Sequence, residues 1–134
     1  MMKNVAHVGI AVSDLGKSVS LLTKLLGRAP EHFEEVTDQM VKTATFGGGE
    51  THIELLQATA PDSAIARFIE KRGEGVHHLS FEVDDIRAEM QRLRDEGFDL
   101  VDKEPRKGAG GYLVAFLHPR STNGVLVELG QKVG

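Results

Sequence analysis

Apolar residues alternate with small or polar residues over residues 5–12 and again over residues 76–83, a pattern typical of β-strands. Side chains alternate between the two faces of a strand, so the apolar residues of each segment share one face. A histidine, His7 or His78, lies on the opposite face among small neighbours. Apolar residues at helical spacing follow each segment, which predicts that each strand leads into an amphipathic helix.

Turn and cap residues divide the rest of the chain into further elements. An aspartate or serine before each helical pattern is a typical N-cap, and a glycine after it is a typical end. The predicted helices run from the cap Asp14 to Gly27, from the cap Ser63 to Gly73 and from the cap Asp85 to Gly97. Further strands are predicted around residues 33–36, 41–46, 51–57, 98–101, 112–117 and 125–129.

The chain contains an internal repeat. Residues 7–15 align with residues 78–86, matching histidine with histidine, the apolar positions, the cap and the first helical residue. Each half has the order strand, helix and three strands. We therefore expect one domain over residues 1–134, with a first module at about 3–58, a connecting helix at about 62–73 and a second module at about 75–131.

Composition narrows the functional classes. The 134 residues include 16 Lys and Arg against 20 Asp and Glu, giving a net charge of −4, which argues against nucleic acid as a partner. The sequence has no cysteine, which excludes disulfides and thiolate chemistry. We expect no membrane-spanning segment and no signal peptide, and hence a cytoplasmic protein.

Four polar residues occupy equivalent places in the two halves. His7 is followed by Glu54 after 47 residues, and His78 is followed by Glu128 after 50. Their strand neighbours are apolar and belong to the core, so the four side chains are expected on the opposite face of a concave sheet. Two imidazoles and two carboxylates suit a divalent Co, Mn, Ni, Fe or Zn ion, whereas a single strand histidine is more often only a hydrogen-bonded residue. Finding two matched pairs favours the metal.

Other polar residues fit structural roles better. His32, His52 and His77 are expected at the surface or around the site, and Asp84 with Asp85 is expected to cap a helix. The glycine-rich residues 108–111 lack the lysine of a phosphate-binding loop and are expected to form a turn.

Several motifs together resemble one family across nearly the whole chain. They are HVGIAVSDL at residues 7–15, IELLQ at 53–57, DSAIARFIEKRGEGVHHLSFEVDDI at 62–86, EPRKGAGG at 104–111 and FLHPRSTNGVLVEL at 116–129. They are similar to the vicinal oxygen chelate superfamily (glyoxalase, bleomycin resistance and dioxygenase proteins), and within it to the methylmalonyl-CoA epimerase family.

The resemblance implies an α+β fold, in which two βαβββ modules form an eight-stranded cupped mixed sheet, and a homodimer. It also implies one divalent metal ion per chain held by His7, Glu54, His78 and Glu128. The implied activity is epimerisation of methylmalonyl-CoA, an acyl-CoA, at C2 by proton abstraction through a metal-stabilised enolate. Glu128 would then be both a metal ligand and the general base.

One position departs from this family. Some members carry a second glutamate as the other base, where this sequence has Thr43. A water molecule, His52 and Lys42 remain candidates for that role. Two other functions also stay open: a glyoxalase I-type lactoylglutathione lyase with the same ligands, and a non-catalytic binding protein of the bleomycin-resistance kind.

Overall fold

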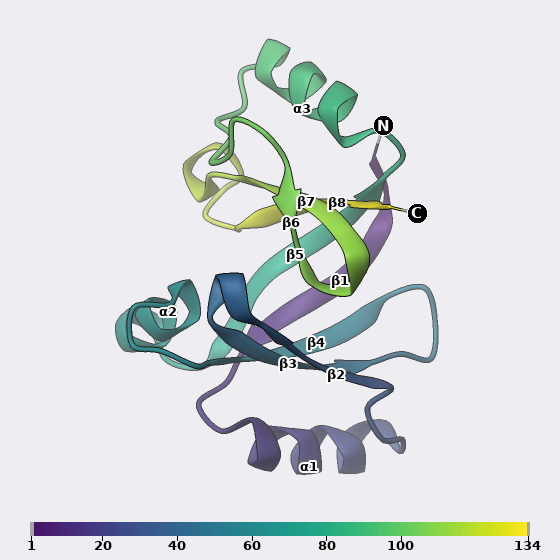
Figure 1. Ribbon diagram of the computed structural model, residues 1–134, viewed down its shortest axis with the longest axis vertical. Helices are drawn as coiled ribbons and strands as arrows, with labels where there is room; N and C mark the ends of the chain where they lie inside the picture. The colour runs from purple at the N-terminus through teal and green to yellow at the C-terminus, as the bar shows by residue number, and fades with distance from the viewer. Residues whose placement is uncertain (1, 134) are drawn as a thin grey trace. The chain divides into compact units, whose positions relative to one another are not determined.

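The computed structural model describes residues 2–133, which divide into two compact units. Residues 7–77 form one unit, and residues 2–6 with residues 78–133 form the other. Helices and strands follow one another in the predicted order (Figure 1). They are β1 (Met2–Ala11), α1 (Leu15–Leu26), β2 (His32–Val36), β3 (Val41–Phe46), β4 (His52–Ala58), α2 (Ala64–Arg72), β5 (Gly75–Val83), α3 (Ile86–Asp95), β6 (Arg106–Lys107), β7 (Tyr112–Leu117) and β8 (Val127–Lys132).

In the unit of residues 7–77, the strands are hydrogen-bonded in the order β2-β3-β4-β1. β1 runs parallel to β4, with Gly9 beside Glu54, and the other two pairs are antiparallel. Helix α1 packs on one face of these strands, where Leu22 and Leu26 join a core around Phe46 and Leu55 (Figure 1). Helices with one apolar stripe are stable when they cover a sheet in this way.

The opposite face of the same strands is partly covered by α2. Ile65 of α2 packs against Ala11, Val41 and Leu56, and all four are buried. The polar residues on this face of β1 and β4 therefore lie outside the part of the face that α2 covers.

In the other unit, β5 pairs in parallel with β8, and β8-β7-β6 are antiparallel. The core lies between α3 and these strands, where Ile86, Met90 and Leu93 pack against Leu117 and Leu129. Each unit thus contains one parallel pair and two antiparallel pairs, which confirms the α+β class and its two βαβββ modules.

The predicted caps are confirmed. The side chains of Asp14, Ser63 and Asp85 accept hydrogen bonds from the first turns of α1, α2 and α3. Gly27 follows α1 in the left-handed region at a φ of 75°, a conformation that glycine adopts without a steric cost. Helix α3 ends two residues before Gly97.

The prediction of a strand at residues 98–101 is wrong. Only Leu100 forms a β-bridge there, with Leu117. The carboxylate of Asp102 then accepts the backbone N–H of Phe116 at 2.8 Å, so that donor is not available to a longer ladder. The short edge strand next to β7 is instead β6.

Within the described residues 2–133, no helix has the length and hydrophobicity needed to cross a bilayer.

Candidate metal-ligating pairs

The first candidate pair, His7 and Glu54, lies on adjacent parallel strands of the unit 7–77. The side chains of β1 and β4 at these positions share a face, because Gly9, two residues after His7, is the register partner of Glu54. His7 Nε2 is 3.6 Å from Glu54 Oε1, and the two side chains are 24% and 13% exposed.

The second pair, His78 and Glu128, repeats this arrangement in the other unit. Ser80, two residues after His78, is the register partner of Glu128 on the parallel strand β8. His78 Nε2 is 3.5 Å from Glu128 Oε1, and the side chains are only 5% and 9% exposed. Within each unit, the structure therefore brings together the two residues that the sequence predicted.

The separation inside each pair fits two neighbouring ligands of a metal ion. With ligand bonds of about 2.1 Å, adjacent ligand atoms of an octahedral or tetrahedral ion lie about 3.0–3.4 Å apart. Imidazole nitrogen and carboxylate oxygen are both good donors to first-row divalent ions. Each pair thus has the donor atoms and nearly the spacing that such an ion requires.

Phe116, which the sequence did not mark as a site residue, contacts His78, and a charged pair lies next to Phe116. Phe116 is the register partner of Glu128 and contacts the His78 ring edge to face, with centroids 6.1 Å apart. The Arg106 guanidinium lies 5.5 Å from the centre of the Phe116 ring, and its Nε is 3.3 Å from Asp102 Oδ1. The strand alternation of residues 112–117 could have indicated Phe116, because it places this residue on the face opposite to the core residue Leu117.

The structure separates the residues named for the second base. His52 is the register partner of His7 and shares its face. Lys42 is the partner of Gln57, on the α1 face, so it cannot serve a site on the opposite face. Thr43 is buried and donates its hydroxyl to the backbone carbonyl of Glu34 at 3.4 Å.

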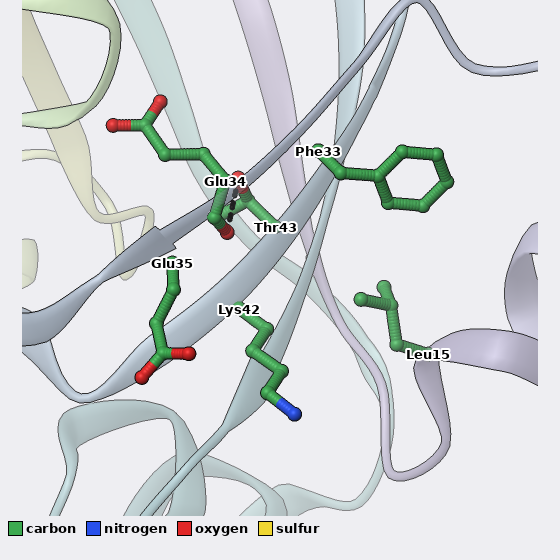
Figure 2. Close-up of a pocket in the computed structure, with 6 residues that line it drawn as sticks. All are labelled: Leu15, Phe33, Glu34, Glu35, Lys42 and Thr43. Carbon is green, nitrogen blue, oxygen red and sulfur yellow. Dashed lines mark hydrogen bonds between the residues drawn. The ribbon is translucent and has the colours of Figure 1, made fainter.

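Lys42 belongs instead to a shallow pocket of about 230 Å³ on the α1 side of the sheet, shown in Figure 2. Its lining includes the side chains of Leu15, Phe33 and Glu35. Glu34 and Thr43, which alternate with these residues along β2 and β3, also contribute to the lining.

Asp85 has the predicted capping role, whereas Asp84 and His77 make other structural contacts. Asp85 caps α3, and Asp84 is an ion-pair partner of Lys3 at 2.7 Å, which lowers the pKa of Asp84 through a hydrogen bond and charge attraction. His77 packs its ring edge to face against Phe68 of α2, 5.0 Å between centroids. Neither group belongs to the pair His7–Glu54 or the pair His78–Glu128.

Comparison with known proteins gives a consistent picture. The model of the Glyoxalase/Bleomycin resistance protein/Dioxygenase superfamily matches residues 6–116. An ethylmalonyl-CoA/methylmalonyl-CoA epimerase of Cereibacter sphaeroides is 38% identical over 98% of this chain and 99% of its own. The mitochondrial methylmalonyl-CoA epimerase of Dictyostelium discoideum is 39% identical over 94% of this chain and 76% of its own.

A solved structure extends the likeness to three dimensions. A variant of Streptomyces coelicolor methylmalonyl-CoA epimerase in complex with 2-nitronate-propionyl-CoA superposes with a TM-score of 0.93 at 34% identity. The match covers 100% of this chain and 97% of the other. The family match and the full-length relatives show that the chain belongs to the Glyoxalase/Bleomycin resistance protein/Dioxygenase superfamily.

Proposed function

We propose that this protein epimerises methylmalonyl-CoA at C2, by removing the C2 proton and returning a proton to the opposite face. The observation that carries the proposal is the full-length similarity to methylmalonyl-CoA epimerases in a chain that also has both His–Glu pairs. C2 lies between a thioester and a carboxylate, so the charge left by the departing proton can be delocalised onto oxygen.

The two pairs together are proposed to supply four ligands to one divalent ion: His7, Glu54, His78 and Glu128. The donor set supports this, because two imidazoles and two carboxylates leave positions of a six-coordinate ion for substrate oxygens. When bound, such an ion supplies Lewis-acid stabilisation of the negative charge that develops on those oxygens.

Glu128 is proposed as the general base. A carboxylate can bind an ion through one oxygen and accept a proton at the other. The Glu128 side chain is only 9% exposed, so little water competes with a substrate for its oxygens. Phe116 beside His78 limits the positions that the imidazole can adopt.

Deuterium exchange tests this function directly. The protein is incubated in D₂O with methylmalonyl-CoA, with and without a chelator, and label at C2 is measured together with the ratio of epimers. We expect exchange and inversion in the untreated protein and the loss of both after chelation. Exchange that persists at full rate in a protein shown to be free of metal would contradict the metal-dependent reaction.

A lactoylglutathione lyase could use the same ligands, so it is the second candidate. The Cereibacter and Dictyostelium epimerases match at 38% and 39% identity over more than nine-tenths of this chain, which favours the epimerase. Assays with a glutathione hemithioacetal and with methylmalonyl-CoA, run on one preparation, separate the two reactions.

We also propose a homodimer, because a small sheet with open edges gains protection by association. Light scattering at micromolar concentration should show a species of twice the 14.6 kDa chain mass. A species near the chain mass alone would contradict it.

A further inference from the structure

Inversion of a carbon centre requires a proton carrier on each face of the planar intermediate. The proposed function gives one of these roles to Glu128, and a second carrier has meaning only if that function holds. Thr43 cannot fill the second role. An aliphatic hydroxyl is not ionised near neutral pH, and the Thr43 hydroxyl already donates to the backbone carbonyl of Glu34.

Glu34 places a carboxylate on the face of the sheet that carries His7. Glu34 lies directly opposite Thr43 on the antiparallel strand, and directly opposed residues project to the same side. Thr43 in turn lies opposite Leu56, two residues beyond Glu54 on β4. The side chains of Glu34, Thr43 and Glu54 therefore occupy one face of the unit 7–77.

Figure 2 shows the Glu34 side chain pointing away from those of Phe33, Glu35 and Lys42. Phe33 and Glu35 alternate with Glu34 along β2, and Glu35 is the register partner of Lys42, so Glu34 is the carboxylate of β2 on the opposite face. Its side chain is 31% exposed, which keeps the carboxylate in reach of water while much of it is covered.

His32 links Glu34 to solvent. Its Nε2 lies 3.2 Å from Glu34 Oε1, it shares the face of Glu34 at a spacing of two residues, and its side chain is 59% exposed. An imidazole placed between a carboxylate and water can relay a proton from one to the other. A carboxylate that has delivered its proton can thus be reloaded.

We propose that Glu34 is the second acid–base residue of this enzyme. In one direction Glu128 takes the proton from C2, and the electron pair of the broken C–H bond moves onto the thioester oxygen. Protonated Glu34 then gives its proton to the opposite face of C2, where a new C–H bond forms. In the other direction the two carboxyl groups exchange roles, and His32 equilibrates Glu34 with water.

Glu34→Gln and Glu35→Gln form a matched pair of variants. Both remove one negative charge from β2, but Glu35 lies on the α1 face beside Lys42. Each variant is mixed separately with each epimer of methylmalonyl-CoA in D₂O. Inversion and deuterium at C2 are then followed, and folding is checked by circular dichroism.

In Glu34→Gln, we expect inversion to fall by about two to four orders of magnitude, the usual contribution of a general acid–base group. Deuterium should still enter the epimer whose proton Glu128 removes, without inversion. Glu35→Gln should behave as the unchanged protein. If the unchanged protein is active and Glu34→Gln inverts the substrate as fast as Glu35→Gln, the role of Glu34 is refuted while the proposed function stands. Equal loss of exchange from both epimers also overturns that role, since a one-sided proton carrier cannot cause such a loss. An unchanged protein with neither exchange nor inversion refutes the proposed function itself.

Discussion

The two His–Glu pairs have nearly the same internal distance but differ in their exposure to water. Nε2 and Oε1 are 3.6 Å apart in His7–Glu54 and 3.5 Å apart in His78–Glu128. The histidine is 24% exposed in the first pair and 5% exposed in the second. An interaction between charges is stronger where less water screens it. Equivalent residues of the repeat therefore have nearly the same pair geometry, but the pair His78–Glu128 is the more buried of the two.

The helices of the two halves also differ in burial, and again the second half is the more buried. Helix α1 has no buried residue, and Leu21 and Leu25 are 64% and 73% exposed. Helix α3 buries four residues, including Met90 and Glu89. Glu89 accepts two hydrogen bonds from Arg92, which lower the pKa of the Glu89 carboxyl. Helix α3 is therefore the more tightly packed of the two helices.

Removal of a histidine ligand should have the largest effect. We expect His7→Ala and His78→Ala each to weaken metal binding on the order of 100-fold or more, since the loss of an outer-shell partner alone costs about 10–100-fold. Epimerisation should disappear with the metal. Metal content is measured by elemental analysis after dialysis. His77→Ala is the matched control, because His77 packs against Phe68, and full metal retention in both ligand variants would refute the assignment.

The two glutamates should respond unequally to the same substitution. Glu128→Gln keeps one ligating oxygen but removes the proton acceptor, so exchange at C2 should fall by about two to four orders of magnitude with most metal retained. Glu54→Gln should keep substantial activity, because its proposed role is ligation alone. Rates of C2 exchange and metal content are measured on both variants. Equal and mild losses would mean that the base lies elsewhere.

The next largest effect concerns stability, which should differ between a buried residue of one helix and an exposed residue of another. Met90→Ala in α3 leaves a cavity at a residue that is 1% exposed, and we expect a loss of about 2–5 kcal/mol in the free energy of unfolding. Leu25→Ala in α1 should change it by less than about 0.5 kcal/mol. Urea unfolding measures both. A large loss in Leu25→Ala would show that another surface covers α1 in solution.

The sequence predicted most elements because its local signals agree with the packing. Asp14, Ser63 and Asp85 accept N-terminal hydrogen bonds where the cap pattern places them. The prediction of a strand at residues 98–101 failed because of contacts with distant parts of the chain, which local sequence patterns do not reveal. Phe98 and Leu100 are apolar because they pack under α3, while the Asp102 side chain takes a backbone donor of β7.

The alternation of side chains along a strand predicts on which face each candidate site residue lies, and no more than that. Alternation alone puts His7 and Glu54 on the face opposite to the core. It does not give the register between strands, and register is what rejects Lys42 and brings Glu34 opposite Thr43. Strand pairing depends on contacts between residues far apart in the chain, so a side chain on a neighbouring strand could be assigned only from the structure.

The smallest effect concerns a contact that both halves share. Gln57 and Gln131 each follow a candidate ligand glutamate by three residues, which puts them on the opposite, helix-facing side of the strand. Gln57 Oε1 accepts the Leu15 N–H at 2.6 Å, and Gln131 Oε1 accepts the Ile86 N–H at 2.8 Å. Helices α1 and α3 thus each begin with a hydrogen bond to a strand that carries a candidate ligand.

Alanine at either glutamine should lower the free energy of unfolding by about 0.5–1.5 kcal/mol, the net value of one hydrogen bond. The two losses should be alike, because the contact is the same in both halves, whereas the losses of activity in Glu54→Gln and Glu128→Gln should differ. Replacing each glutamine with glutamate keeps an acceptor oxygen at the positive end of a helix and should restore stability. Urea unfolding at pH 7 checks all four variants. If only one of the two alanine variants loses stability, the two hydrogen bonds have the same geometry but contribute unequally to the free energy of unfolding. The difference in burial between the two His–Glu pairs would then extend to the helices.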